Sequence, residues 1–463
     1  MPESLLVWNT LIAGFAPLFT APTFRLFVEI MSGWVLCPGR HTVTRIYQIA
    51  EPEFKRSHDE YHRFFPDAAW VLPKLWRHVA VAAVGLFRPI GLIPVDLDDT
   101  VFHKTGPKVD GAGWWRDAVR STKTKVVHCF GLNLIILTFR VNPPWGVEPL
   151  GLPINMRLHR KKESTLLELA MQMLEETATW FPDRHFIVSA DGFFAPLAGD
   201  KFFDPKDATP AAKNILVSRL RCDAALYGIP KKPLTPQKGR PATKGKRLPT
   251  PVKLAQLCRK WKRVKVNMRG REVVRLVAAY TVLWYHVCKT RPVKLVITRD
   301  PDGIEHDDFF FTTDVDLAPE VVIAQYSGRW SIEDTFRNTK QFMGGQDPQT
   351  WKIDGPKRAA AFSFIVYSLT WIWFIQTKKY KKTCWLSLPW YRSKATPSFQ
   401  DALAGLRTVL WHARILNNSA KTPLFTKNMV TAQVAAGASA IRCIMRALVF
   451  LAARSVECYG CRT

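Results

Sequence analysis

The sequence predicts an α/β protein with helical regions at both ends of the chain and a β-rich insertion in its core. Three observations support this. Apolar residues recur at helical spacing through residues 1–88, β-branched and apolar runs begin at about residue 90, and helical spacing returns at about residue 319. A chain of 463 residues is long enough to form several domains, each with its own core.

The predicted domain boundaries follow these changes of pattern. We expect an N-terminal helical domain over 1–88, which suits either DNA binding or a plain helical cap. The core occupies 89–225 and 316–380, a basic linker and β-rich insertion occupy 226–315, and a C-terminal helical region occupies 381–463.

The linker is the most basic part of the insertion. Residues 229–251 contain seven Lys or Arg and no acid, among many Pro and Gly. This composition predicts an extended segment that is either a solvated linker or a loop that follows phosphates.

The core begins with "GLIPVDLDDTVF", a strand that ends in acids, and continues with "TKVVHCFGLNLIILTFRV" and "VEPLGLPINMRL" as two further strands. A helix follows, because Thr165 and Glu168 form a capping box ahead of "LLELAMQMLEETATWF". The next run, "HFIVSADGFFAPL", predicts a buried strand that ends at Asp191. Acids are therefore expected at the ends of the first and fourth strands.

The net charge favours a polyanionic partner. Sixty-six Lys and Arg against 38 acids leave a net charge of +28, far more than solubility requires, so a nucleic-acid partner is expected rather than an anionic membrane.

Nine scattered cysteines suit a reducing compartment. Cys458 and Cys461 form a single CxxC pair, which alone is weak evidence for zinc.

One apolar stretch can be read either as a membrane-spanning helix or as a buried core helix. Residues 359–376, "AAAFSFIVYSLTWIWFIQ", are long enough to span a membrane and have basic residues on both sides. We predict a buried core helix instead and expect no stable membrane association, with the membrane-spanning reading as the alternative.

The stretch "YSGRWSIEDTF" carries the strongest site signal. On one helix, Tyr326, Arg329, Glu333 and Lys340 would share a narrow face. Taken alone, these four residues are best read as an ion-pair face on the helix surface. The acids expected at the ends of the first and fourth strands favour instead a site that they form together with Glu333. Oxygen ligands of this kind select Mg²⁺ or Mn²⁺, and two such ions support phosphodiester chemistry.

With these residues in place, the sequence resembles bacterial insertion-sequence DDE transposases of the cut-and-paste type. Their helix signature is Tyr, two residues, Arg, three residues, Glu, six residues and Lys; Tyr326, Arg329, Glu333 and Lys340 match it, and Trp330 follows the Arg as is usual. The early stretches "TFRLFVEIMSGWVL" and "YHRFFPDAAW" resemble the helical N-terminal region of one branch, the DDE superfamily endonucleases.

The resemblance implies an RNase H-like catalytic core in which a first Asp, Asp191 and Glu333 hold two Mg²⁺ or Mn²⁺ ions. It also implies DNA contacts. Tyr326, Arg329 and Lys340 would bind phosphates at the transposon end, and Trp330 would stack near a displaced base unless it is a core residue.

The first acid has more than one candidate, because "VDLDDT" offers Asp96, Asp98 and Asp99. Relatives with an acid directly before Thr point to Asp99, and relatives that read Asp, any residue, Thr point to Asp98. We favour Asp99 and keep Asp98 as the alternative.

The predicted function is that of a DNA transposase. It would bind terminal inverted repeats of double-stranded DNA as a homo-oligomer, cleave the DNA and join the 3′ ends to target DNA, in the bacterial cytoplasm at the nucleoid. The alternative is a non-catalytic DNA-binding protein derived from such an enzyme, which would share the basic surface without needing the acids.

Overall fold

The computed structural model describes residues 2–50, 55–117, 120–122, 124–146, 148–204, 213–230, 242–381 and 394–419. The chain divides into two compact units, both discontinuous in sequence. The first unit comprises Met1–Val79, Phe102–Leu132 and Arg337–Thr463, and the second comprises Ala80–Val101 and Asn133–Phe336.

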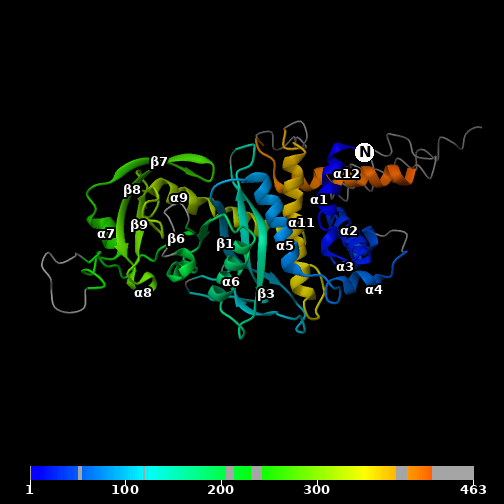
Figure 1. The fold of residues 1–463 in the computed structure, drawn as a ribbon, viewed down its shortest axis with the longest axis horizontal. Helices are drawn as coiled ribbons and strands as arrows, with labels where there is room; N and C mark the ends of the chain where they lie inside the picture. The colour runs from blue at the N-terminus through cyan, green and yellow to red at the C-terminus, as the bar shows by residue number, and fades with distance from the viewer. Residues whose placement is uncertain are drawn as a thin grey trace, which may run out of the picture. The chain divides into compact units, whose positions relative to one another are not determined.

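The first unit is mainly helical, as predicted for residues 1–88, and its elements are coloured blue and orange to yellow in Figure 1. Its N-terminal helices are α1 (Glu3–Ala13), η1 (Ala16–Leu18), α2 (Ala21–Leu36), α3 (Val43–Ala50), α4 (His58–Phe64) and the first part of α5 (Leu72–Phe87). Its C-terminal helices are the end of α10 (Ser331–Gln341), α11 (Gly355–Gln376) and α12 (Phe399–Ser419).

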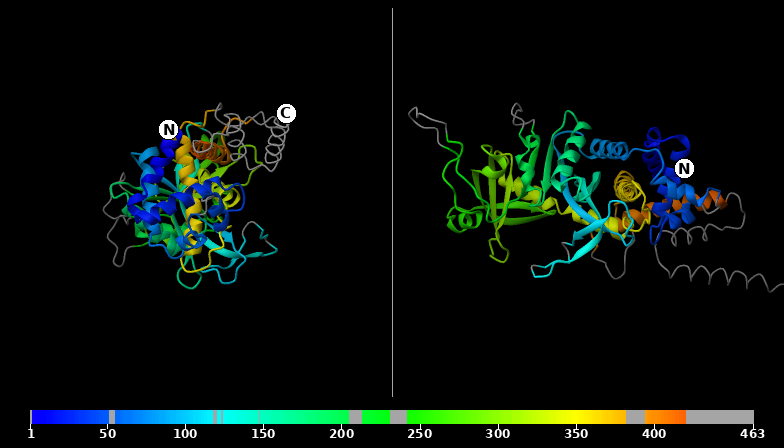
Figure 2. Two further views of the ribbon diagram at one scale, coloured as in Figure 1. Left: turned by 90° about the vertical axis from the view of Figure 1, so that its right-hand side faces the viewer. Right: turned by 90° about the horizontal axis from the view of Figure 1, so that it is seen from below.

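Helix α11 is the core helix of the first unit. Helices α1, α2 and α12 pack against it, and Figures 1 and 2 show it beside α1 and α12. Among the described residues it alone is long and apolar enough to cross a membrane, but 94% of that window is buried in the fold. The prediction of a buried helix over 359–376 is therefore confirmed. A polar anchor holds its N-terminal end, since Arg358 donates to the carbonyls of Phe65, Ala68 and Trp70.

A single sheet organises the second unit. The strands lie in the order β3-β1-β5-β6-β10-β9-β8-β7, and β4 also pairs with β3. Strands β1, β5 and β6 are parallel, and the pairs β3–β4, β6–β10, β10–β9, β9–β8 and β8–β7 are antiparallel. Their bounds are β1 (Ile93–His103), β3 (His128–Val141), β4 (Leu150–His159), β5 (Phe186–Ala190), β6 (Ile215–Arg219), β7 (Lys262–Met268), β8 (Arg271–Leu283), β9 (Pro292–Arg299) and β10 (Asp308–Thr312).

The helices of the second unit include α6 (Leu166–Thr179), which begins at the predicted capping box: the hydroxyl of Thr165 accepts from the Glu168 N–H, and the Glu168 carboxylate accepts from the Thr165 N–H. Helix α9 (Pro319–Gly328) packs against β5, β6, β7, β9 and β10. The remaining elements are α7 (Pro251–Leu257), α8 (Tyr285–Cys288), η2 (Ala195–Gly199), η3 (Lys201–Phe203) and most of α10 (Ser331–Gln341).

The predicted strands of the core are all present, but the first does not end at its acids, because β1 continues past Asp99 to His103. The order of three strands, a helix and a strand is observed, but a short strand, β2 (Gly113–Arg116), lies between the first two and pairs with the start of β3 in the first unit. The insertion is β-rich as expected and also contains α7 and α8. Because β10 pairs with β6, the insertion extends the core sheet. Residues 231–241 of the basic segment, and Cys458 and Cys461, lie outside the described residues.

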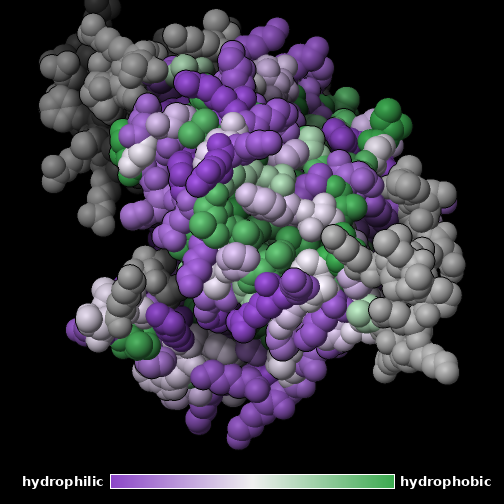
Figure 3. Space-filling model, turned by 90° about the vertical axis from the view of Figure 1, so that its left-hand side faces the viewer, coloured by the Kyte–Doolittle hydropathy of each residue, from purple (hydrophilic) through white to green (hydrophobic). Residues whose placement is uncertain are grey.

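The end of the second unit that carries β7, β8 and α7 has a hydrophilic surface around an apolar centre, which Figure 3 shows as green atoms surrounded by purple ones. A hollow of about 480 Å³ in this unit is lined by Leu257, Tyr280 and Pro319 together with Arg259 and Lys260.

Candidate active site

Two of the predicted acids are neighbours because of the strand register. Strands β1 and β5 are parallel, and Leu97 pairs with Ala190, so Asp98 and Asp191 each come next on adjacent strands. Residues at matching positions of paired strands project to the same face of the sheet. Asp98 and Asp191 therefore share a face, and Asp99 projects to the other.

Asp191 is held by the turn that follows β5. Its Oδ1 accepts a hydrogen bond from the Phe193 N–H at 2.9 Å, and its carbonyl accepts one from the Ser218 hydroxyl at 2.8 Å. The sequence predicts this position because a buried run ends at an acid followed by glycine.

Arg329 bridges Asp98, the alternative candidate for the first acid, and Glu333, the third predicted acid. Its Nη1 lies 2.6 Å from Oδ2 of Asp98, and its Nη2 lies 3.0 Å from Oε1 of Glu333. Burial opposes the positive charge, but Asp98, Tyr326 and Glu333 outweigh this effect and raise the pKa of Arg329. The guanidinium is therefore permanently charged and draws two carboxylates to one point.

Asp98 has a strongly perturbed ionisation. Burial raises its pKa to about 7, and the negative charges of Asp191 and Asp99 add to this effect, while Arg329 acts in the opposite direction. The attraction of Arg329 therefore does not offset the cost of burying the charged carboxylate beside two other acids.

The prediction of one continuous helix through Tyr326, Arg329, Glu333 and Lys340 is wrong. Helix α9 ends at Gly328, and α10 begins at Ser331. The amides of Arg329, Ile332 and Glu333 bond to carbonyls three residues earlier, which tightens the chain at this joint. Periodicity does not reveal the joint, because Arg329 retains right-handed helical dihedral angles.

The other predicted DNA contacts lie in different surroundings. The Tyr326 ring packs on Phe310 with centroids 4.6 Å apart, and burial raises the pKa of its hydroxyl. Trp330 is 41% exposed, and the guanidinium carbon of Arg269 lies 4.1 Å from its ring centroid. Lys340 belongs to the part of α10 assigned to the first unit, with Nζ 6.0 Å from the Phe102 ring centroid.

A buried network under the joint was not predicted. Arg140 donates to both carboxylate oxygens of Asp96, and the hydroxyl of Ser331 donates to Asp96 Oδ2 at 3.1 Å. Arg140 also donates to the side chain of Gln325 at 2.7 Å. Gly328 leaves room for this guanidinium, because a Cβ there would lie 2.7 Å from Nη1. The network fastens the end of α9 and the start of α10 to β1 and β3.

The sequence carried a signal for this network. Asp96 lies two residues before Asp98 and so projects to the same face of β1, and Arg140 is the only Lys or Arg in the mostly apolar strand β3. Arg140 and Gln325 also line a hollow of about 540 Å³, to which Arg88 and Arg269 contribute further positive charge.

Comparison with known proteins places the chain in a family. The family described as DDE superfamily endonuclease matches residues 14–289, more than half of the chain, so the protein belongs to the DDE superfamily endonucleases. The match includes Asp98, Asp99 and Asp191 and ends before Glu333.

A solved structure of a piggyBac transposase synaptic complex with hairpin DNA is similar to this chain at 10% identity, with a TM-score of 0.42. The similarity covers 94% of this chain and 85% of the other. No curated protein matches the chain.

Proposed function

We propose that this DDE superfamily endonuclease is a DNA transposase. It binds the inverted repeats at transposon ends as an oligomer, cleaves the DNA and joins the 3′ ends to target DNA. The observation that carries the proposal is the cluster in which Arg329 links Asp98 to Glu333 beside Asp191, in a member of an endonuclease family. The net charge of +28 supports a nucleic-acid substrate.

The strand order supports an RNase H-like core. Strands β4, β3, β1, β5 and β6 lie side by side, with β3 antiparallel to β4 and with β1, β5 and β6 parallel. In this order the first strand is central and the strand that ends at Asp191 is its neighbour. Helices α9 and α10 then bring Glu333 to the same edge.

The acids fit divalent cations. All three offer oxygen ligands, which Mg²⁺ and Mn²⁺ prefer, and burial, with added repulsion from Asp191 and Asp99, disfavours the charged form of Asp98 when no cation is present. Two such ions, when bound, would activate a water or a 3′-hydroxyl and stabilise the leaving oxygen. Among the described residues, the three acids do not form a compact ligand group, because Arg329 lies between Asp98 and Glu333.

The chain's own residues would orient the DNA. Arg269 presents an exposed guanidinium group next to Trp330, where it can bind phosphate oxygens. Arg329 is bonded to Asp98 and Glu333, so it would bind a phosphate only after releasing one of these carboxylates. The Trp330 ring is sufficiently exposed to stack on a base. The Asp96–Arg140 pair touches no substrate in this scheme; it positions the joint that carries Arg329 and Glu333.

We assign the first acid to Asp98 rather than to Asp99, which the sequence favoured. The contact with Arg329 and the charge interaction with Asp191 support this assignment. Asp99 projects to the other face of β1, as the strand register indicates.

The test is cleavage of linear DNA that carries the sequences flanking the coding region, with purified full-length protein and Mg²⁺. Glu333→Gln should reduce cleavage by about 100-fold or more, because removing one metal ligand loses several kcal/mol of transition-state stabilisation. DNA binding, measured by fluorescence anisotropy, should change little. Asp98→Asn should behave like Glu333→Gln, and Asp99→Asn should retain most activity.

The matched control is Glu175→Gln, an exposed glutamate on α6, which should cleave like the wild type. Cleavage by Glu333→Gln at the wild-type rate would refute the proposed site. Specific binding by the wild type without metal-dependent nicking would favour the non-catalytic alternative.

A further inference from the structure

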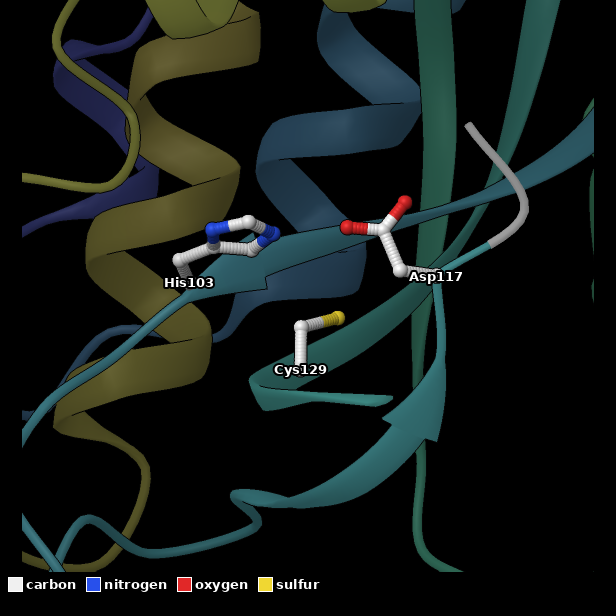
Figure 4. Close-up of side chains that lie close together, drawn as sticks. All are labelled: His103, Asp117 and Cys129. Carbon is white, nitrogen blue, oxygen red and sulfur yellow. The ribbon is translucent and has the colours of Figure 1, made fainter. Parts of the chain in front are cut away.

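A second group of ligand-type side chains lies in the first unit. The Nδ1 or Nε2 of His103, a carboxylate oxygen of Asp117 and the Sγ of Cys129 all lie within 4.8 Å of one another. Figure 4 shows the three side chains converging from the end of β1, the residue after β2 and the start of β3. It is the one such group of three among the described residues, and it contains none of the proposed catalytic acids.

Backbone contacts with the start of β3 hold the three residues together. The Lys104 N–H donates to the Phe130 carbonyl at 3.0 Å, and the Asp117 N–H donates to the Val127 carbonyl at 2.8 Å. Cys129 pairs with Trp115 of β2. The positions of the ligand atoms therefore follow from strand pairing and not from free loops.

Gly131 permits the closest of these approaches. A Cβ at this residue would lie 2.2 Å from the carbonyl oxygen of Phe102, which no real structure tolerates. The glycine therefore allows the end of β1 to lie against β3, which brings His103 next to Cys129.

The donor atoms of the group suit a metal that binds nitrogen and sulfur, although the buried thiol must be deprotonated on binding. Burial, together with the positive charges of Lys340 and Arg120, lowers the pKa of His103, so its imidazole is neutral at pH 7 and has a lone pair to donate. Burial, with a contribution from Asp117, raises the pKa of Cys129, so the thiol must lose a proton when it binds a cation.

The orientation of Asp117 is already fixed. Its carboxylate accepts from the Arg120 N–H at 3.0 Å and from the Arg120 Nε at 2.8 Å. The Arg120 side chain is 59% exposed and can move away from a cation, and the exposed His103 gives a path of entry from solvent.

We propose that His103, Asp117 and Cys129 form a binding site for Zn²⁺, with water as the fourth ligand. Zn²⁺ accepts thiolate, imidazole and carboxylate together, whereas Mg²⁺ does not take thiolate. Bonds of roughly 2.0–2.3 Å place tetrahedral ligand atoms about 3.5 Å apart, so small rotations of the three side chains complete the geometry. The ion would hold the segment between β1 and β3 in place, independently of the acids in the second unit.

The test uses Co²⁺ as a spectroscopic substitute for Zn²⁺, in full-length protein in which Cys458 and Cys461 are both replaced by Ser. Titration at pH 8 should give a thiolate-to-cobalt charge-transfer band that saturates near one equivalent and disappears when Zn²⁺ is added. Millimolar Mg²⁺ should leave the band unchanged. Cys129→Ser should abolish it, and Asp117→Asn should weaken binding at least tenfold.

The controls separate this site from surface binding. His58 and His62 lie on α4 with their Nε2 atoms 3.0 Å apart, so they are the competing surface pair. The variants His58→Gln/His62→Gln and Cys222→Ser, the latter at an exposed thiol, should keep the full band. Arg120→Ala should tighten binding a few-fold, since it removes a positive charge beside Asp117.

Two outcomes would overturn the proposal: a wild-type protein without a saturable band, or a Cys129→Ser variant that keeps it. A readout that needs no variant guards against misfolding. Zn²⁺ should slow alkylation of Cys129 in the parent protein, as followed by mass spectrometry, and should leave alkylation of Cys222 unchanged. Equal alkylation of Cys129 with and without Zn²⁺ would also contradict the proposal.

Discussion

Among single residues, Asp98 is the carboxylate whose ionisation is most informative. Its pKa is raised to about 7, chiefly by burial, against an ordinary value of 3.8. Between about pH 4 and pH 7 the folded protein therefore binds more protons at this position than the unfolded chain does. The free energy of unfolding must fall as pH rises through this window, because ionisation is easier in the unfolded state.

This linkage predicts how an Asp98→Asn variant behaves. The amide cannot ionise, so the variant escapes the loss of stability that the wild type undergoes as pH rises. We subtract the melting temperature of the wild type from that of the variant at each pH. This difference should be several degrees larger at pH 8 than at pH 5. Thermal unfolding followed by circular dichroism at the two pH values, without divalent cations, measures the difference. A difference that is the same at both pH values would contradict the prediction.

Individual side chains were partly predictable. The pattern predicts that Asp191 follows a buried strand, as observed, while the roles proposed for Asp191 and Glu333 rest on the resemblance. The choice between Asp98 and Asp99 depends on the side of β1 from which α10 approaches. Alternation alone assigns no such side to a strand buried on both faces. Arg329 illustrates the same limit, because its bond to Asp98 joins residues that are remote in sequence.

At the scale of elements, the close approach of β1 and β3 at Gly131 has a measurable effect on the free energy of unfolding. Gly131→Ala should lower the free energy of unfolding by about 1–3 kcal/mol, since the new methyl group would overlap the Phe102 carbonyl and force β1 and β3 apart. Gly85→Ala is the control of opposite sign. Gly85 lies in α5 with no atom within 4 Å of its added Cβ, so alanine there should stabilise by about 0.5–1 kcal/mol.

Chemical denaturation of the three proteins under one set of conditions measures both effects. If Gly131→Ala unfolded at the same or a higher denaturant concentration than Gly85→Ala, the close approach of β1 and β3 would be wrong. The same Gly131 variant should weaken Co²⁺ binding at His103 and Cys129, because it moves their strands apart.

Elements were predicted better than their junctions. The strands of the core and the capped helix α6 were evident from periodicity and capping residues. The break between α9 and α10 was not, because local hydrogen bonds three residues apart leave the apolar spacing nearly unchanged. Strand β2 escaped prediction since four residues with one buried side chain give too little periodic signal.

The excess charge of the whole molecule makes a prediction about DNA affinity. Counter-ions released from DNA should make binding strongly salt-dependent: if six phosphates are neutralised, affinity falls by about 10³-fold between 50 and 200 mM salt. Fluorescence anisotropy with a labelled duplex measures this slope. Glu333→Gln, which removes an acid and no cation, should keep the slope. An affinity that does not respond to salt would argue against phosphate contacts.

The arrangement of the whole sheet could not be predicted from the sequence. Periodicity indicates that strands exist. It does not indicate that β6 pairs with β10, which joins the insertion to the core sheet, because these strands are far apart in sequence. The family to which the chain belongs, the DDE superfamily endonucleases, was predicted from the resemblance of its motifs. The Asp96–Arg140 network and the His103, Asp117 and Cys129 group arise only when distant segments meet.

The parallel pairing of β1 with β5 and of β5 with β6 also bears on how the chain folds. Asp98, Asp191 and Glu333 are remote from one another in sequence, and no local hairpin brings them together. Closing such long loops costs entropy before any contact compensates for it, so the core sheet should form slowly. Newly made chains would then expose the apolar edges of β1 and β5 for some time. Production of the protein should accordingly be sensitive to chain concentration and temperature, in a way that its final fold does not reveal.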